Sequence, residues 1–414
     1  MSASVDEQMA VLMRGVEYGD PHIQRTMEQD LRERLKLGRP LRVYCGFDPT
    51  FTGLTLGNMV PMLKLRQFQR FGHEVTFLMG TMTATVGDPS DKAAARQQLT
   101  MEEVQANCQN WLEQAYRVLD PEKTIVRYNA DWLAPLTLAD VVELASNFTV
   151  AEFLAHETFK KRMAEERPLY IHEFIYALMQ AYDAHHMHTD VQVGGVDQLF
   201  NIMAGRKLQQ ALGELPLVAL CTPLLIGTDG VLKMSKSAGN SINMDMTPAD
   251  MYGKLMSIPD SLMGNYYTLL TDVPQDEIDA VVAGKTNPMQ AKKRLAHEVV
   301  ALLHDEAAAD AAQAEFERVF QRGQQPEEAV GVDWTGLPEA APGPDGAKSV
   351  QLARLISDHI GVSMSEARRL IRQGAVSVDG IVTKEDVVGV HRGTVIRVGR
   401  HRFLRILGSP RPDA

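Results

Sequence analysis

The sequence predicts an α/β fold, in which a Rossmann-like, doubly wound parallel sheet is followed by an all-helical domain and a small α+β domain. Short apolar runs of strand length alternate with helical stretches in the first half of the chain, which is typical of a parallel sheet. The sequence becomes helix-rich near residue 247 and basic near residue 349, which predicts two further domains. A chain of 414 residues with 45% hydrophobic residues can bury two or three cores, in agreement with this division.

The first part of the sheet is predicted from a strand, turn, helix and strand in succession. Leu41–Phe47 is an apolar strand, and Asp48-Pro49-Thr50 has the composition of a turn. A helix is expected from about Gly57 to Arg70, and the next strand is Glu74–Met79. Such a unit places both strands in parallel.

Two later runs, Asp190–Val193 and Val218–Leu220, are predicted to be further strands of the same sheet. Ligands of doubly wound sheets bind beyond the carboxyl ends of the strands. Polar residues at or just past these ends are Asp48, Thr50, Asp197 and Gln198. Neither a Gly-x-Gly-x-x-Gly fingerprint nor a Walker A sequence is present, which argues against a dinucleotide dehydrogenase and a P-loop NTPase.

Helical signals dominate from Thr247 onward. Thr247 precedes Pro248 and is followed three residues later by Asp250, a pattern typical of a helix N-terminus. Asn287-Pro288 begins another helix, and the helical domain is expected to reach about Arg322. The segment from Gln324 to Lys348 is rich in Pro, Gly and Glu and is therefore predicted to be a linker.

The C-terminal module is basic, although the whole chain has a net charge of −11. From Ser349 onward, eleven Arg and Lys face six Asp and Glu, a net charge of +5. Ser363-x-x-Glu366 is a capping box for a short helix that ends at Gly374. Strand-like runs follow at Ala375–Val378 and Thr394–Leu407. The candidate RNA-binding residues of this module are Arg368, Arg369, Arg372, Arg397 and Arg400. Guanidinium groups so arranged suit RNA phosphates, but charge alone is equally compatible with a solvated surface.

The chain carries no signal for a membrane or an oxidising compartment. No apolar run approaches the ~20 residues that span a bilayer, and the N-terminus is acidic and polar. Three distant cysteines, Cys45, Cys108 and Cys221, indicate neither a disulfide framework nor a zinc site. We therefore expect a cytoplasmic protein. Acidic and histidine residues crowd between Asp183 and Asp190, but in a helix that runs into a strand they point several ways, so no dedicated metal site is expected.

A Gly-bracketed loop from Gly230 to Asn240 contains Lys233 and Lys236, flanked by Ser235 and Ser237. Ammonium groups on flexible stems, with hydroxyls and glycines beside them, suit a polyphosphate that gains charge during a reaction. The same composition also occurs in ordinary solvated turns. Other motifs must therefore decide between the two interpretations.

Four motifs in this order resemble those of bacterial tyrosyl-tRNA synthetases, which are class I aminoacyl-tRNA synthetases: Tyr44-Cys-Gly-Phe-Asp-Pro-Thr50, Gly87-Asp-Pro-Ser90, Gly194-Gly-Val-Asp-Gln198 and Lys233-Met-Ser-Lys-Ser237. The resemblance extends over essentially the whole chain. It implies a catalytic domain at 1–228, a signature loop at 229–241, a helical anticodon-binding domain at 242–322, a linker at 323–348 and an S4-like RNA-binding domain at 349–414. It also implies a homodimer and tRNA(Tyr) as partner.

The resemblance implies a pocket for L-tyrosine. Tyr44 and Asp183 match the pair that binds the phenol, and Asp88, Tyr176 and Gln180 match the group that holds the ammonium. Tyr176, Gln180 and Asp183 follow one another at i, i+4 and i+7, so they share a helix face. A buried carboxylate opposite a hydroxyl would be left unpaired by phenylalanine.

The resemblance also implies ATP as a substrate, with Mg2+ bound to the nucleotide. Residues that match ATP-binding positions are Asp48, Thr55, Gly57, Asn58, Gly195, Asp197, Gln198 and Lys236. Residues that match positions near the reacting phosphates are Thr50, Lys92, Arg96, Lys233 and Lys236. The tyrosine carboxylate would attack the α-phosphorus, and a ribose hydroxyl of the tRNA would then take the tyrosyl group. Because a carboxylate is already ionised, positioning and positive charge can supply the catalysis without a protein nucleophile.

The chain departs from the family where a His-x-Gly-His is usual. It has Thr55-Leu-Gly-Asn58, so both imidazoles are missing. Loss of one transition-state donor can cost on the order of 10²–10³ in rate, by analogy with oxyanion donors. Two alternatives therefore stay open: a synthetase-like RNA-binding protein whose activation has weakened, and a tryptophan-specific relative, which Tyr44 and Asp183 disfavour.

Overall fold

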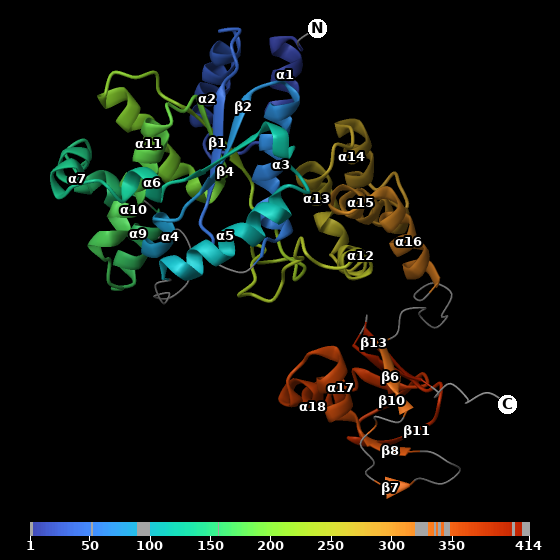
Figure 1. The fold of residues 1–414 in the computed structure, drawn as a ribbon. Helices are drawn as coiled ribbons and strands as arrows, with labels where there is room; N and C mark the ends of the chain where they lie inside the picture. Colours follow the sequence, from blue (N-terminus) through green and yellow to red (C-terminus); the bar gives the residue numbers. More distant parts are fainter. Residues whose placement is uncertain are drawn as a thin grey trace. The chain divides into compact units, whose positions relative to one another are not determined.

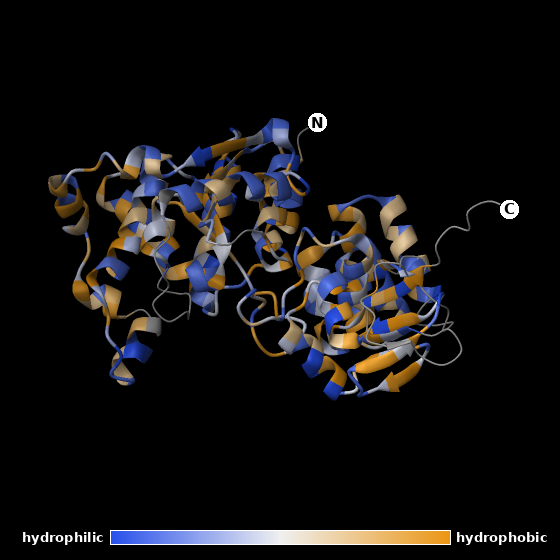
Figure 2. Ribbon diagram, turned by 60° about the horizontal axis from the view of Figure 1, so that its bottom comes forward, coloured by the Kyte–Doolittle hydropathy of each residue, from blue (hydrophilic) through white to orange (hydrophobic). Residues whose placement is uncertain are grey.

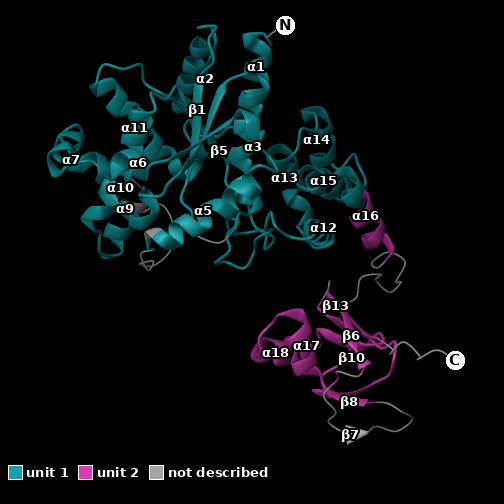
Figure 3. Cartoon of the chain, in the orientation of Figure 1, with its two compact units in different colours: residues 1–309 teal, residues 310–414 magenta. Residues whose placement is uncertain are grey.

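The computed structural model (Figure 1) describes residues 3–50, 53–88, 100–155, 157–318, 330–334, 337, 341–342, 348–399 and 402–407. The chain forms two compact units, residues 1–309 and residues 310–414 (Figure 3).

A five-stranded parallel sheet is the centre of the first unit. Its strands are β1 (Arg42–Phe47), β2 (Glu74–Met79), β3 (Thr124–Tyr128), β4 (Val191–Gly195) and β5 (Val218–Thr222). They lie in the order β3-β2-β1-β4-β5, and every neighbouring pair is parallel. Because the order runs outward from β1 in both directions, the sheet is doubly wound, and the predicted fold class is confirmed.

Strand β3 was not predicted from the sequence. It is an edge strand whose residues are all half-buried or exposed, and Ile125 and Tyr128 are each 36% exposed. The central strands are buried on both faces and therefore read as apolar runs, whereas an edge strand needs no such run. Its register is set by pairing with β2, where Val75 lies opposite Thr124.

Helices cover both faces of this sheet. In Figure 1 the sheet stands between α11 (Leu199–Ala211) on the left and α3 (Leu56–Arg70) on the right. Helix α3 packs against β1, β2 and β4, and α11 packs against β4 and β5. The other helices of this part are α1 (Val5–Leu12), α2 (Pro21–Leu35), α4 (Thr83–Val86), α5 (Met101–Ala115), α6 (Ala130–Leu133), α7 (Leu138–Ala145), α8 (Val150–Leu154), α9 (Glu157–Ala164) and α10 (Ile171–His186).

A run of helices follows the sheet: α12 (Pro248–Met256), α13 (Met263–Leu270), α14 (Gln275–Val282), α15 (Pro288–Leu303) and α16 (Glu306–Phe316). Both predicted helix starts are confirmed. The Thr247 hydroxyl accepts a hydrogen bond from the amide of Asp250, at 3.2 Å. The Asn287 side chain accepts from the amides of Met289 and Gln290. Each cap satisfies amides that the first helical turn leaves without a partner.

The second unit contains two small sheets and a pair of helices. Its elements are β6 (Val330–Asp333), β7 (Ala341–Pro342), β8 (Lys348–Gln351), α17 (Leu352–Ile360), α18 (Met364–Arg372), β9 (Val376–Val378), β10 (Ile381–Thr383), β11 (Val387–Val390), β12 (Val395–Val398) and β13 (Arg402–Leu407). One sheet has the order β10-β9-β12-β13-β6, and the other has the order β11-β8-β7. Both helices contribute buried residues to the core of this unit, among them Leu355, Ile356 and Ile371.

The predicted linker between Gln324 and Lys348 is wrong in one part. Strand β6 lies within it and pairs in parallel with β13, with Val332 opposite Ile406. Val332 is only 2% exposed and belongs to the core of the second unit. The Pro- and Gly-rich residues around this short strand hid it, because composition averages over a window longer than four residues.

Two details of the C-terminal module also differ from the prediction. The run Thr394–Leu407 is not one strand but the hairpin of β12 and β13, with Gly399 between them at φ 67°, a value that favours glycine. Only half of the capping box forms, since the Ser363 hydroxyl accepts from the Glu366 amide while the Glu366 carboxylate binds Arg369.

Hydrophobic and hydrophilic residues alternate along the helices and strands (Figure 2), as amphipathic elements around a core require. Among the described residues, no helix is both long enough and apolar enough to cross a bilayer.

Candidate active site

Both residues of the predicted phenol pair are buried beside the centre of the sheet. Tyr44, on β1, is 1% exposed, and Asp183, on α10, is 2% exposed. The Asp183 carboxylate accepts hydrogen bonds from Trp132 Nε1, at 2.7 Å, and from Asn129 Nδ2, at 3.1 Å. The buried hydroxyl of Tyr44 makes no hydrogen bond to any described residue. A buried polar group without a partner is costly, so this hydroxyl indicates a place for a ligand atom.

Burial perturbs both groups of this pair. It raises the pKa of the Asp183 carboxyl to about 8, although the hydrogen bonds from Asn129 and Trp132 act in the opposite direction. It also raises the pKa of Tyr44, and the nearby charge of Asp183 adds to this effect. The pocket can therefore exchange hydrogen bonds with a phenol in a place from which water is largely excluded.

A second cluster forms where β1 ends. The Asp48 carboxylate accepts from the hydroxyl of Tyr176, at 3.0 Å, and from the hydroxyl of Thr83, at 2.7 Å. Gly80 makes this approach possible, because a Cβ at that position would lie 1.9 Å from Asp48 Oδ1. The resemblance implies a tyrosine-binding role for Tyr176 and an ATP-binding role for Asp48, whereas their side chains are in direct contact.

Asp88 and Gln198 join two of the motifs. Gln198 Nε2 donates to Asp88 Oδ2 at 2.5 Å, and Asn201 Nδ2 donates to Gln198 Oε1 at 3.2 Å. The charges of Asp48 and Asp88 both raise the pKa of Tyr176, after burial, so both carboxylates lie close to its hydroxyl. Gln180 is half-buried on α10 and makes no hydrogen bond to the described residues. These groups form an acidic pocket that suits an ammonium.

The signature loop reaches the same edge of the sheet. Lys233 Nζ lies 3.3 Å from Asp197 Oδ2 and forms an ion pair with it. Lys236 Nζ lies 3.0 Å from the position that a Cβ on Gly53 would take, and the Asp245 carboxylate is nearby. Burial lowers the pKa of Lys236, and the charge of Asp245 opposes this shift.

Asn240 organises this loop from within and was not predicted. It is 3% exposed, accepts from the Ser235 amide at 2.9 Å, and donates to Asp229 Oδ2 at 2.8 Å. Its amide also donates to the carbonyl of Lys233, at 3.2 Å. The sequence holds only a weak signal for this role, namely an asparagine directly after Gly239 at the end of the loop.

The departure from His-x-Gly-His lies at the N-terminus of α3. Asn58 Oδ1 accepts from both the amide and the hydroxyl of Thr55, each at 2.9 Å. Gly57 faces the loop, since a Cβ there would lie 3.7 Å from Met234 Cβ. The hydroxyl proton of Thr55 is therefore used within the helix cap, which leaves the Asn58 amide hydrogens as the side-chain donors of this turn.

Among the remaining predicted ATP-site residues, the structure describes Thr50 and Gly195 but not Lys92 and Arg96. Thr50 follows β1, and its amide donates to the carbonyl of Asp48 at 2.7 Å. Gly195 ends β4 in a place without room for a side chain, because a Cβ would lie 2.6 Å from Asp197 Oδ1. Lys92 and Arg96 lie outside the described residues, as do Pro89 and Ser90 of the second motif.

The predicted RNA-binding arginines have local partners. Arg369 binds Glu366, Arg368 Nε lies 3.8 Å from Asp386 Oδ2, and Arg372 Nε donates to the carbonyl of Arg368. All three are exposed on α18, as is Arg397 on β12, and Arg400 lies outside the described residues. The charges of α18 are thus balanced in part by acids of the same unit.

Several further residues of the site were not found from the sequence. Asn129 and Trp132 come from the segment after the unpredicted strand β3, and Thr83 and Gly80 come from the turn after β2. The position of Gly80 directly after a predicted strand is the one sequence signal for its role in the site. No sequence signal indicates a role for Trp132.

The cluster of acids and histidines from Asp183 to Asp190 separates in the structure. Asp190 binds the guanidinium of Arg39 with both carboxylate oxygens, at 2.8 Å, while His185 Nδ1 lies 2.9 Å from Glu214. Within the described part of the chain, no three His, Cys, Asp or Glu residues gather where they could hold a metal ion.

The chain matches known proteins over most of its length. The family model described as tRNA synthetases class I (W and Y) matches residues 36–321. The chain therefore belongs to the class I tRNA synthetases of this family. It is 43% identical to a tyrosine–tRNA ligase of Moorella thermoacetica, over 98% of this chain and 97% of that protein, and 45% identical to one of Symbiobacterium thermophilum, over 98% of each. The resemblance to bacterial tyrosyl-tRNA synthetases is thus confirmed.

Solved structures share the fold at lower identity. A C-terminally truncated mitochondrial tyrosyl-tRNA synthetase of Aspergillus nidulans is 24% identical with a TM-score of 0.61, covering 77% of this chain and 94% of that one. A tyrosyl-tRNA synthetase of Archaeoglobus fulgidus, in complex with L-tyrosine, is 22% identical with a TM-score of 0.59, covering 75% and 100%.

Proposed function

We propose that this chain is a tyrosine–tRNA ligase, which activates L-tyrosine with ATP and transfers the tyrosyl group to the terminal adenosine of tRNA(Tyr). Full-length relatives at 43% and 45% identity with this activity in their names support the assignment. Within the site, the assignment depends on the Tyr44 hydroxyl, which has no hydrogen-bond partner among the described residues and lies beside the buried carboxyl of Asp183.

Tyrosine would bind with its phenol between Tyr44 and Asp183. The site would reject phenylalanine, because that substrate would leave both protein groups without the expected partner. The ammonium would be held by Asp88, Tyr176 and Gln180. Asp48, through its hydrogen bond to Tyr176, adds a further negative charge to this end of the pocket.

ATP would bind along the strand ends, with Asp48, Thr55, Gly57, Asn58, Gly195, Asp197 and Gln198 as the binding residues and Thr50, Lys92, Arg96, Lys233 and Lys236 near the phosphates. Mg2+ would arrive with the nucleotide as part of the substrate. A tyrosine carboxylate oxygen forms a bond to the α-phosphorus, and the bond from that phosphorus to the bridging oxygen breaks, releasing pyrophosphate. In the second step a ribose hydroxyl of the tRNA attacks the tyrosyl carbonyl, and AMP leaves.

Lys233 would change partners during this reaction. Its ion pair with Asp197, at 3.3 Å, supports a resting position in which the lysine neutralises a residue of the proposed nucleotide site. When phosphates enter, they can compete for the ammonium, because a phosphate carries more charge than one carboxylate. The lysine would then serve the departing pyrophosphate.

The activation step tests this proposal. Purified protein with tyrosine, ATP and magnesium should catalyse tyrosine-dependent pyrophosphate exchange, and tryptophan should not replace tyrosine. Lys236→Ala should lower the exchange rate by roughly 10²-fold while the tyrosine KM changes little, because the ammonium acts on the transition state. Equal losses in both would mean that the loop shapes the tyrosine pocket instead.

The weakened-enzyme alternative is favoured by one observation. The Thr55 hydroxyl is used within the cap of α3, so it has no proton left for a phosphate. Pyrophosphate exchange should be compared between the protein and a Thr55→His, Asn58→His variant. An unchanged rate would mean that other donors have replaced the imidazoles; absence of exchange and of tRNA charging in the protein would support an RNA-binding function alone.

We also propose the domain division given by the resemblance, with residues 242–322 and 349–414 contacting tRNA, the latter extended at its start to include β6. A homodimer in the cytoplasm is proposed as the assembly. Large apolar side chains are exposed on α7, α8 and the start of α10, and they support a subunit contact in this region. They are Leu138, Val142, Val150, Tyr170 and Ile171, at 53% to 81% exposure. Sedimentation of a Val142→Glu, Ile171→Glu variant as a monomer is the expected result.

A further inference from the structure

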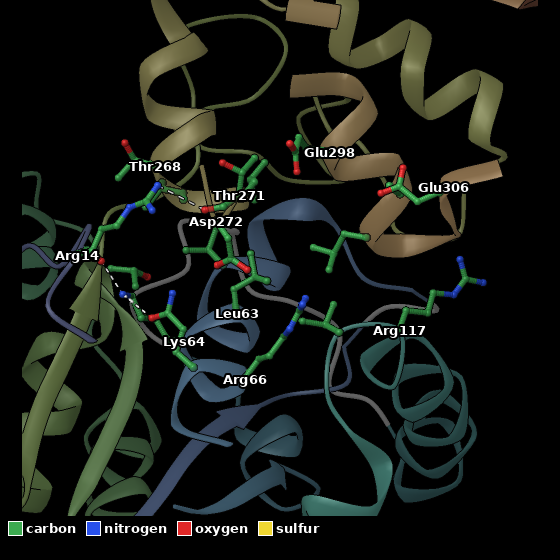
Figure 4. Close-up of a pocket in the computed structure, with 18 residues that line it drawn as sticks. Arg14, Leu63, Lys64, Arg66, Arg117, Thr268, Thr271, Asp272, Glu298 and Glu306 are labelled. Atoms are coloured by element: carbon green, nitrogen blue, oxygen red, sulfur yellow. Dashed lines mark hydrogen bonds between the residues drawn. The ribbon is translucent and has the colours of Figure 1, made fainter. Parts of the chain in front are cut away.

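A cavity of about 430 Å³ lies in the first unit, away from the proposed tyrosine and ATP residues (Figure 4). Its walls come from α3, from Arg14 after α1, from Arg117 and Val118 after α5, from Thr222 at the end of β5, and from α13 and α15 with the segments after them. It therefore lies where α3 meets the helical part of the first unit. Its volume is in the range of small-molecule sites.

Two guanidinium groups in the wall lack neutralising partners. Arg66 is half-buried and makes no hydrogen bond or salt bridge to any described residue. Arg14 Nε is fully buried and makes no hydrogen bond, and its terminal nitrogen makes only a 3.5 Å contact with the Thr271 carbonyl. Burial lowers the pKa of both arginines, and the charge of Asp272 only partly offsets this effect. Partly buried charged groups with so few partners destabilise the folded protein, unless a ligand of opposite charge pairs with them.

The carboxylates of the wall lie within 3.8 Å of basic side chains outside it, namely two arginines and a histidine that is charged only when protonated. Asp272 pairs with Arg70 at 2.8 Å, Glu298 lies 3.7 Å from Arg294, and Glu306 lies 3.8 Å from His297. Arg70, Arg294 and His297 do not line the cavity.

The wall has two further basic residues. Lys64 donates to the carbonyls of Leu12 and Arg14 and to Gln67, and burial, with Arg14 adding to it, lowers the pKa of its ammonium to about 7. Arg117 donates to the Met244 carbonyl and gains no carboxylate partner in the described chain. Among the described residues, none of the three guanidinium groups of the wall forms an ion pair with a carboxylate of the wall.

We propose that this cavity binds a small molecule with two or more anionic groups, phosphates or carboxylates, through the guanidinium groups of Arg14 and Arg66. A guanidinium offers a planar fork of donors that matches such oxyanions, and a doubly charged ligand can satisfy both arginines at once. Apolar wall residues such as Leu63 and Leu269 leave room for an organic body between the charged ends. Occupation would link α3, which carries Arg66, to Arg14 and to the end of α13, where the Thr271 carbonyl contacts Arg14 (Figure 4).

The test uses the full chain and two probes with two or more anionic groups each, propane-1,3-diyl bisphosphate and citrate, without magnesium. Calorimetry should show that at least one of them binds, with a dissociation constant on the order of 1 mM, and thermal unfolding should show that it raises Tm. Arg66→Gln should raise the dissociation constant of the probe at least about tenfold. Arg14→Gln, a second and separate variant, should raise it by a similar factor. The probe that binds tells whether phosphate or carboxylate is preferred.

Two controls separate this cavity from the rest of the surface. Arg25→Gln, which removes an exposed arginine of α2, should leave binding unchanged. Lys236→Ala reports any binding of the probe at the proposed phosphate site of the signature loop, which is separate from the cavity. Tyrosine binding reports whether each variant is folded; if Arg66→Gln does not fold, Arg14→Gln and Arg66→Lys give the answer. The proposal is overturned if neither probe binds the protein, or if binding survives both arginine variants.

Discussion

The hydroxyl of Tyr44 and the carboxyl of Asp183 lie in the same dry pocket, but only the carboxyl has partners in the protein. This difference determines how each side chain affects the stability of the protein without a ligand. Asp183 is held in place by Trp132 and Asn129, whereas the Tyr44 hydroxyl contributes nothing to the folded state until a ligand meets it. The two residues therefore respond differently to substitution.

Tyr44→Phe should leave the stability of the free protein unchanged or raise it slightly, because no hydrogen bond is lost. The tyrosine KM in pyrophosphate exchange should rise roughly 3- to 10-fold, the value of one hydrogen bond. Tyr18→Phe is the matched control, since the equally buried Tyr18 hydroxyl donates to the Ala219 carbonyl at 2.6 Å. That control should lower Tm and leave KM unchanged; the reverse pattern would contradict the assignment of the pocket.

The raised pKa of Asp183 predicts a slope of stability with pH. The carboxyl releases its proton near pH 4 in the unfolded chain and only at about 8 in the native state. Between these values the native state binds more protons, so this group's stability is fully present at low pH and is lost as pH rises toward about 8. The loss is at most about 1.4 kcal/mol per pH unit.

Urea unfolding at several pH values between about 5 and about 7.5 measures this slope. Asp183→Asn should remove the contribution, so its stability should fall less steeply with rising pH than that of the protein itself. The comparison of slopes is independent of any constant stability difference between the two proteins. Parallel curves would show that the carboxyl ionises normally.

The elements around the site differ in how they hold it. Helix α3 is fixed at its start by hydrogen bonds from Leu56 to Ile242 and from Met244 to Leu54, which join it to the segment that follows the signature loop. The loop is held by backbone hydrogen bonds, among them Met234 to Leu225, and by the side chain of Asn240, which binds both Ser235 and Asp229. If the two lysines act on a reacting phosphate, as proposed, Asn240 fixes their position, and misplacement would lower the rate steeply.

Asn240→Ala should therefore lower the rate of pyrophosphate exchange by at least about tenfold, with little change in the tyrosine KM. The loop would lose its links to Ser235 and Asp229, and Lys233 and Lys236 would sample more positions. Asn147→Ala, at the exposed end of α7, is the control and should leave the rate unchanged. A large rise in the tyrosine KM of Asn240→Ala, with an unchanged kcat, would assign Asn240 to the tyrosine pocket instead.

Across the whole molecule, the tyrosine, ATP and loop residues belong to the first compact unit, and the basic residues predicted to contact RNA belong to the second. The two units have separate cores, since the cluster around Val350, Ile356 and Leu404 contains only residues of the second. Activation and tRNA binding are therefore expected to be separable.

A chain that ends at residue 318 should retain tyrosine-dependent pyrophosphate exchange at close to the full rate and lose most tRNA charging. Electrostatic contacts of the missing unit with phosphates would account for this loss, which should be reduced at low salt. Exchange and charging measured on the same preparation give the result. A parallel loss of both activities would show that the first unit needs the second in order to function.

The sequence by itself determined the parts of this protein that follow from local pattern. The buried central strands are apolar runs in the sequence, and Thr247 and Asn287 have the pattern of helix N-caps. Four ordered motifs indicated the family. Each of these signals lies within a few neighbouring residues. Only the tertiary structure decided that β6 joins the C-terminal sheet and that Tyr176 contacts Asp48. It also decided that Trp132 donates a hydrogen bond to Asp183 and that Arg14 and Arg66 line the same cavity. These contacts join residues far apart in the chain, and their energies depend on burial and on the partners available, which no local pattern contains.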